Sequence, residues 1–263
     1  MTKRNRRKKK KQVVNFDFIT ALNDVYAQIP ETTGCLENIS KEFGGCQGYC
    51  CFLQNPHLLS CEFENAWRYI LKEWSVEQIV DVIGKSLRNY LAGQITKGCV
   101  MWDEKTKLCK CHKHRPLSCY LYSITPDEEF SERMNRVQEK YKNNPLMIFR
   151  PQCKLVSTVD GKKVTKEDTD KWWNEIIAIE QKCGVSRDDI KDEAGGTYLT
   201  FHDHLLLKIL PEYLIENLAR VRLYGTPEEK EGIIITISNL FSKQMAKEKD
   251  GTEPTGQSDS TKS

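Results

Sequence analysis

The sequence predicts a mainly α-helical protein in which an irregular, cysteine-rich metal-binding subdomain with short hairpins is embedded among helices. Two observations predict this class. Apolar residues recur at intervals of three and four over most of the chain, which is the spacing of helices packed on a core. In contrast, nine of the eleven cysteines fall between residues 35 and 119, partly in glycine-rich segments without that periodicity. A loop folded around a metal fits such a segment better than a helix does.

In the first half of the chain, periodic apolar residues predict a helix from Phe16 to Ile29, which Pro30 ends. The segment 35–61 is expected to be a loop, and residues 62–74 a helix. Ser75 begins the next helix, with Gln78 completing a capping box and Gly93 ending it. This helix pair separates two groups of cysteines in the sequence and is expected to fold them together.

The middle of the chain alternates short hairpins with a helix. A polar turn between Val100–Trp102 and Leu108 predicts a hairpin that carries Cys99 and Cys109. Thr125, Pro126 and Glu128 predict a helix start with Thr125 as the cap, and that helix should run to about Lys142. Asp160-Gly161 predicts the turn of a second hairpin within 153–164.

The C-terminal half of the chain is predicted to be helical. Helices are expected to begin at Thr165, Thr200, Pro211 and Thr226. His202-Asp203-His204 is interpreted as the polar first turn of one of them, and Cys183 as a core residue at the end of another. The predicted organisation is a disordered basic arm (1–11), a cysteine-cluster metal-binding domain (16–125), a helical C-terminal region packed on it (126–246) and a disordered tail (247–263).

Composition narrows the class of protein. The 263 residues are 39% hydrophobic and 29% charged, as in an ordinary globular protein. No apolar run is long enough to span a membrane, and no apolar segment follows the basic N-terminus as it would in a secretion signal. We therefore expect a cytoplasmic protein without membrane contact, whose thiols serve metal or redox chemistry rather than disulfides.

The net charge of +3 is unevenly distributed. Residues 1–11 carry eight lysines and arginines and no acid, which leaves the rest of the chain at −5. Such an arm cannot fold alone. It is either a solvated tail or a means of weak contact with RNA or a ribosome through Lys3–Lys11.

The cysteine spacings favour a metal site. Cys46-x3-Cys50 and Cys109-x-Cys111 allow one loop to supply two ligands, and Cys99 and Cys119 lie close to the second pair. Buried free thiols or a redox-switched disulfide remain alternatives for single cysteines. His112 and His114 are further possible ligands, although exposed histidines on a basic loop are commoner.

Two segments, GGCQGYCC and CKCHKHRPLSC, resemble the YkgJ-type cysteine-cluster family, which is described as chelating zinc or iron. Cys109, Arg115, Pro116 and Cys119 match the family's second element, and Cys99 its upstream cysteine. Together the two segments cover roughly residues 35–125. The resemblance implies a ligand set of Cys46, Cys50, Cys51, Cys99, Cys109 and Cys119.

The chain also departs from the family pattern. Phe43 occupies the place of the family's first cysteine, so Cys35 is a candidate substitute. Cys111 and His112 replace the usual Ile-Tyr, which adds Cys111 as a candidate ligand, and Tyr120 replaces an arginine. Arg115 is expected to offset the negative charge of a thiolate-rich site.

The predicted function is therefore a metal-binding cysteine-cluster protein that holds zinc or an iron–sulfur centre. All-cysteine sites accept either metal, so the two stay open. One alternative is an iron–sulfur-dependent protein-modifying enzyme resembling flagellin lysine N-methylase. Another is an RNA- or ribosome-associated module that uses the basic arm. No Walker loop, G-x-S-x-G or H-E-x-x-H motif identifies a catalytic residue.

Overall fold

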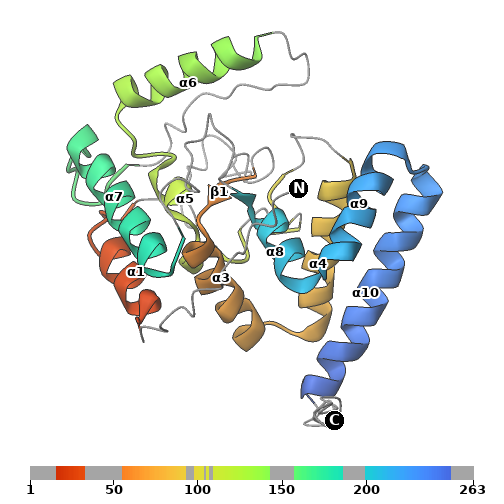
Figure 1. Cartoon of the computed structure of the whole chain (residues 1–263). Helices are drawn as coiled ribbons and strands as arrows, with labels where there is room; N and C mark the ends of the chain where they lie inside the picture. The colour runs from red at the N-terminus through yellow and green to blue at the C-terminus, as the bar shows by residue number, and fades with distance from the viewer. Residues whose placement is uncertain are drawn as a thin grey trace, which may run out of the picture.

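The computed structural model describes residues 16–32, 55–92, 98–103, 105–106, 109–142, 157–185 and 199–249. This part of the chain is mainly α-helical, as predicted (Figure 1). The basic arm, the tail after residue 249 and the cysteine loop at 33–54 lie outside the described residues. The helices are α1 (Phe18–Tyr26), α3 (Ser60–Glu73), α4 (Val76–Ala92), a 3₁₀ turn (His112–His114), α5 (Leu117–Leu121), α6 (Asp127–Tyr141), α7 (Lys166–Lys182), α8 (Phe201–Ile209), α9 (Glu212–Tyr224) and α10 (Pro227–Lys249).

Several predicted helix starts are confirmed by their capping bonds. The Ser75 amide donates to the Gln78 side chain at 2.9 Å, and the Gln78 amide donates back to the Ser75 hydroxyl. Thr165 forms the same kind of box ahead of α7, as does Thr200 ahead of α8. Thr226 exchanges equivalent bonds with Glu229 at the start of α10. Polar caps therefore set these boundaries, because each satisfies amides that have no partner within the helix.

Other boundaries differ from the prediction. The α6 helix begins at Asp127 with Pro126 in the cap position. Thr125 does not cap it, because its hydroxyl donates backward to the Leu121 carbonyl at 2.7 Å. Helix α10 runs to Lys249, which is three residues into the segment predicted as a tail. Helix α5, which carries Cys119, was not predicted.

The turn at Asp160-Gly161 forms, and the chain beside it pairs with a segment that the sequence did not indicate. Gly161 has φ of +68° and its amide donates to the Thr158 carbonyl at 3.2 Å. Thr158 bridges Thr32 in antiparallel fashion, so this turn pairs with the chain that follows α1. The expected first strand at 153–156 lies outside the described residues. A further pairing joins β1 (His57–Leu58) to β2 (Leu199–Thr200), with His57 opposite Thr200.

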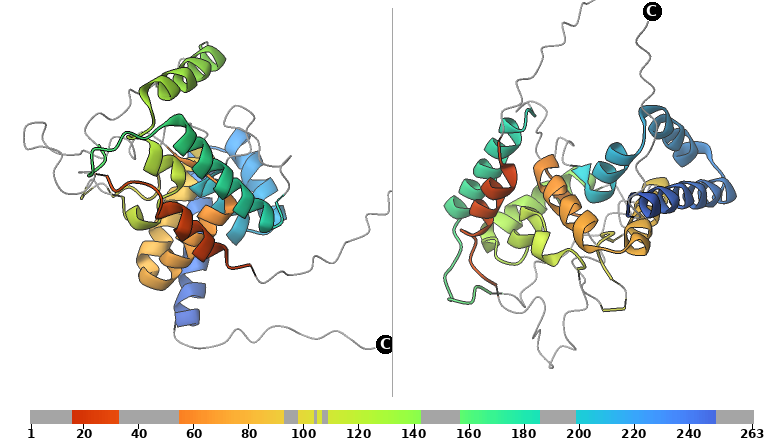
Figure 2. Two further views of the ribbon diagram at one scale, coloured as in Figure 1. Left: turned by 90° about the vertical axis from the view of Figure 1, so that its left-hand side faces the viewer. Right: turned by 90° about the horizontal axis from the view of Figure 1, so that it is seen from below.

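Two clusters of buried apolar side chains form the core. The first, here called the α4 cluster, surrounds α4 with residues from α3, α8, α9, α10 and the segment 98–111. The second, the α7 cluster, joins α1, α5 and α7 to the start of α3. Helices α1 and α7 lie side by side at one end of the molecule, with α4 and α10 at the other and α3 between them (Figures 1 and 2). None of the described helices is long and apolar enough to cross a membrane.

Candidate metal centre

The structure describes one half of the predicted ligand set. Cys99, Cys109, Cys111 and Cys119 lie in described segments, and none of them forms a disulfide with another described cysteine. Cys35, Cys46, Cys50, Cys51 and Cys153 lie outside the described residues. The geometry of the site is therefore built from the second cysteine element and from the helices that hold it.

The predicted hairpin carries the first of these cysteines. Trp102 forms an antiparallel bridge with Cys109, and the Lys110 amide donates to the Met101 carbonyl at 2.8 Å. The Trp102 amide donates to the Cys99 carbonyl at 3.0 Å, which closes a turn at the start of the hairpin. Cys109 is thereby paired with the chain that follows Cys99.

An ionic contact fixes that polar turn. The Lys110 ammonium lies 3.4 Å from the Asp103 carboxylate and 3.6 Å from the Asp81 carboxylate of α4. Asp103 also accepts the amides of Lys105 and Thr106 at 2.9 Å each. The amide bonds, and then Lys110, lower the pKa of Asp103 to about 2, so this carboxylate stays charged.

Cys111 lies at the inner end of the hairpin. It is 3% exposed within the α4 cluster, and Cys99 and Cys109 are half-buried against the same cluster. Burial raises the pKa of the Cys111 thiol, and the neighbouring thiols of Cys109 and Cys99 raise it further. Cys99, Cys109 and Cys111 therefore pack against one cluster, and their role as ligands stays a prediction.

Cys119 is placed by a separate element. It is half-buried in α5, which begins after Pro116 with its first turn in the α7 cluster. The Arg115 guanidinium lies over the Tyr120 ring at 4.1 Å and donates to the Nε2 atom of His112. The Nε of Arg115 is buried without a hydrogen-bond partner among the described residues. Arg115 is thus held inside the cysteine element rather than on the open surface.

Both histidines of this loop have protein partners. Burial, and then the Arg115 charge, lowers the pKa of His112 to about 4. His114 stacks on Tyr69 of α3 with ring centroids 4.2 Å apart, and burial lowers its pKa as well. The expectation of exposed histidines is therefore corrected for both rings, because α3 and Arg115 cover them.

Two buried carboxylates that sequence reasoning missed hold the start of α3. Glu62, 2% exposed, accepts the Leu59 amide at 2.9 Å, the Tyr26 hydroxyl at 2.9 Å and the Leu117 amide at 2.6 Å. Burial raises the pKa of Glu62, while the two amides oppose that shift. Glu62 stands three residues after Leu59, the spacing of a helix-start box, which is the one signal that could have identified it.

Glu180 comes to the same place from α7. It is 3% exposed and accepts the amides of Ser60 and Cys61 at 3.0 and 2.8 Å. Burial, followed by the Glu180 charge, raises the pKa of the Cys61 thiol, which favours a neutral core thiol there. No local sequence pattern predicts the buried role of Glu180, because its hydrogen-bond partners are about 120 residues away in sequence.

The His202-Asp203-His204 stretch and Cys183 are the remaining residues that the sequence analysis interpreted. Asp203 caps α8 through Thr200, and His202 Nδ1 lies 2.9 Å from the Thr200 hydroxyl. His204 Nε2 lies 3.0 Å from the Leu58 carbonyl. These partners confirm the interpretation of this stretch as a helix start. Cys183 is exposed rather than buried, because it follows the last turn of α7.

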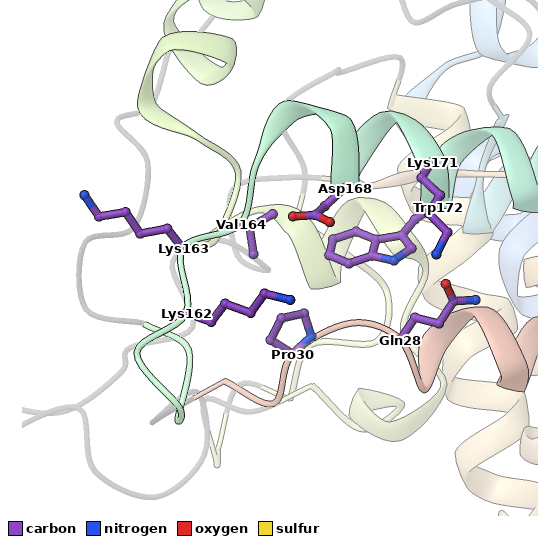
Figure 3. Close-up of a pocket in the computed structure, with 8 residues that line it drawn as sticks. All are labelled: Gln28, Pro30, Lys162, Lys163, Val164, Asp168, Lys171 and Trp172. Carbon is purple, nitrogen blue, oxygen red and sulfur yellow. The ribbon is translucent and has the colours of Figure 1, made fainter.

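A separate cavity lies between the end of α1 and the start of α7 (Figure 3). Its volume is about 210 Å³, and it is lined by three lysines, Asp168 and the Trp172 ring among others. No cysteine or histidine lines it. It is therefore distinct from the cysteine element and offers no soft ligand for a metal.

The donors of the cysteine element fit zinc or iron. Thiolates are ligands that both metals accept, and Arg115 supplies a positive charge within the same element, over the Tyr120 ring next to Cys119. Among the described residues, no group of three or more His, Cys, Asp or Glu residues could hold a metal ion. The other predicted ligands, Cys35, Cys46, Cys50 and Cys51, lie outside the described segments.

A comparison with family models identifies the matching family. The model named CxxCxxCC, described as a "putative zinc- or iron-chelating domain", matches residues 42–183. The match includes every cysteine of the chain except Cys35, and it extends beyond residue 125 through α7. No curated protein and no solved structure matches the chain. Since the matched segment spans more than half of the sequence, the chain belongs to the CxxCxxCC family of zinc- or iron-chelating domains.

Proposed function

We propose that this protein holds zinc or an iron–sulfur centre through cysteine thiolates from two separate elements. The proposed ligands are Cys46, Cys50, Cys51, Cys99, Cys109 and Cys119, with Cys35 and Cys111 as further candidates. The observation that carries the proposal is the family match over residues 42–183, and the packing of Cys99, Cys109 and Cys111 against the α4 cluster supports it. A reducing compartment such as the cytoplasm would keep these thiols available.

The chain's own residues would serve the metal in defined ways. The hairpin supplies two or three thiolates from a rigid base, since it packs on the α4 cluster. Arg115 compensates the negative charge of the thiolates, and its buried Nε has a proton to donate to an acceptor at the site. When bound, zinc would cross-link the two elements, whereas an iron–sulfur cluster would in addition accept and release electrons.

The test compares serine variants at two proposed ligands with one at an exposed cysteine. Structural zinc contributes roughly 10–16 kcal/mol of binding free energy, or about 3 kcal/mol for each of four ligands. We therefore expect Cys109→Ser and Cys119→Ser to weaken zinc binding by about 100-fold and to destabilise the fold. Cys183→Ser should retain the wild-type metal content, because Cys183 is exposed at the end of α7.

The measurement is elemental analysis for zinc, iron and sulfide after anaerobic purification, with an absorption spectrum of the same sample. A brown protein with iron and acid-labile sulfide would identify a cluster, and a colourless protein with zinc would identify a zinc site. Equal metal content in all three variants would refute the proposed ligands.

A further inference from the structure

We infer that the Glu62 carboxylate is the positioning group that fixes α5, and with it the proposed ligand Cys119, on the start of α3. The inference rests on the proposed function, since it concerns a ligand named there. Glu62 touches no proposed ligand itself. It acts through the backbone at the start of α3 and at the start of α5, which carries Cys119.

The three hydrogen bonds of Glu62 join segments that are distant in sequence. One oxygen accepts the amide of Leu59, which lies eight residues after Cys51. The other oxygen accepts the amide of Leu117, two residues before Cys119, at 2.6 Å. The Tyr26 hydroxyl donates to this second oxygen and ties the joint to α1. A single carboxylate therefore sets the distance between the start of α3 and the start of α5.

A second bond supports the same joint. The Ser118 hydroxyl donates to the His57 carbonyl at 2.9 Å. Thus two consecutive residues of α5 are bonded to the segment 57–62. His57 is itself held by its pairing with Thr200 in the two-stranded sheet. The Cys119 helix is consequently docked on a segment that cannot shift freely.

The chemistry of the joint requires a carboxylate. The amides of Leu59 and Leu117 lie at helix starts, where they have no acceptor within their own helix. A carboxylate offers an acceptor oxygen to each of them. Glutamine has the same shape but offers one carbonyl oxygen and one amino group, so it cannot accept both amides at once.

Glu180 provides a matched control. It is another buried carboxylate at the start of α3, and it also accepts two backbone amides there. Among the described residues, its hydrogen bonds go to Ser60 and Cys61 and not to α5. Glu62→Gln and Glu180→Gln therefore carry the same chemical change, but only the first loosens the Cys119 helix.

The experiment measures zinc affinity of the full-length protein by competition with a chelator of known affinity. We expect Glu62→Gln to weaken zinc binding by about 10- to 100-fold, as loss of a supporting group around a metal commonly does. Glu180→Gln should stay within about threefold of the wild type. Ser118→Ala removes a half-buried hydroxyl at the same joint and should weaken zinc binding by a smaller factor. It provides the test if Glu62→Gln does not fold.

Hydrogen–deuterium exchange provides a second measurement that does not depend on metal. Glu62→Gln should accelerate amide exchange in the peptide that contains Leu117, and Glu180→Gln in the peptide that contains Ser60 and Cys61. Wild-type zinc affinity in Glu62→Gln, or an equal loss in Glu180→Gln, would overturn the inference. A wild-type protein that binds neither zinc nor iron would instead refute the proposed function, and the exchange data would still test the joint.

Discussion

The base of the cysteine hairpin offers a test of how the core supports the metal site. Met101 lies within the hairpin, is 4% exposed and belongs to the α4 cluster together with Cys111. Met101→Ala removes the side chain that packs the hairpin against the α4 cluster. The backbone hydrogen bond from the Lys110 amide to the Met101 carbonyl remains in place. Truncation of a buried methionine to alanine costs about 2–5 kcal/mol, and we expect about 3 kcal/mol here.

The control is Ile176→Ala, which makes a similar cavity in the α7 cluster. Ile176 is 0% exposed, so its truncation should also cost about 2–5 kcal/mol. Urea unfolding followed by circular dichroism measures both losses, and chelator competition measures zinc affinity in each variant. We expect zinc affinity to fall about tenfold in Met101→Ala and to remain near the wild type in Ile176→Ala, because only the first loosens the hairpin.

Two results would refute this reasoning: a larger loss of zinc affinity in Ile176→Ala than in Met101→Ala, or equal losses in both variants. Equal losses of zinc affinity would mean that the site responds to global stability rather than to the α4 cluster. A loss of unfolding free energy below about 1 kcal/mol in Met101→Ala would mean that the hairpin is not seated by this side chain.

Two further predictions concern pH and helix capping. Burial lowers the pKa of His202 and His204, so the unfolded chain takes up protons before the folded one does as the pH falls through the ordinary histidine range. Unfolding free energy should therefore decrease on acidification, and a His202→Asn, His204→Asn double variant with matched metal content should lose less stability between pH 7.5 and 5.5. Thr165→Ala removes the cap of α7 and should lower the unfolding free energy by about 1 kcal/mol in a urea titration, with unchanged zinc content. A wild-type midpoint in that titration would contradict the capping role.

Local patterns predicted most of the helices. The boxes at Ser75, Thr165, Thr200 and Thr226 lie within four residues of sequence, so each can be recognised without knowledge of the fold. The hairpin that carries Cys99 and Cys109 was predictable for the same reason.

The joints between elements were not predictable in this way. The pairing of β1 with β2 joins residues about 140 positions apart, and the bond from Ser60 to Glu180 spans 120. Nothing near Glu180 in sequence distinguishes it from a surface glutamate of an amphipathic helix. An isolated cysteine at the end of a predicted helix indicates a core residue, whereas the place of Cys183 after the last turn of α7 exposes it.

The end of the family match at residue 183 has a physical explanation in the fold. Helix α7 closes the matched segment, and it contributes Trp172 and Ile176 to the core around α1 and α5. It also contributes Glu180, which satisfies the first amides of α3. Helix α5 docks on the same start of α3 through Glu62 and Ser118, whose bonds are separate from those of Glu180. The matched unit is therefore larger than the cysteine-rich stretch and includes α7, which packs with α1 and α5 in the α7 cluster.

Helices α8 to α10 complete the other side of the same unit. They lie beyond the matched residues and pack on α4, where they contribute Leu205, Leu206 and Ile234 to the α4 cluster. Cys99, Cys109 and Cys111 pack against that same cluster. The α4 cluster thus forms the base of the hairpin, whereas the α7 cluster packs α7 against α1 and α5. Helix α3 contributes to both clusters, and its Glu62 bonds to α5.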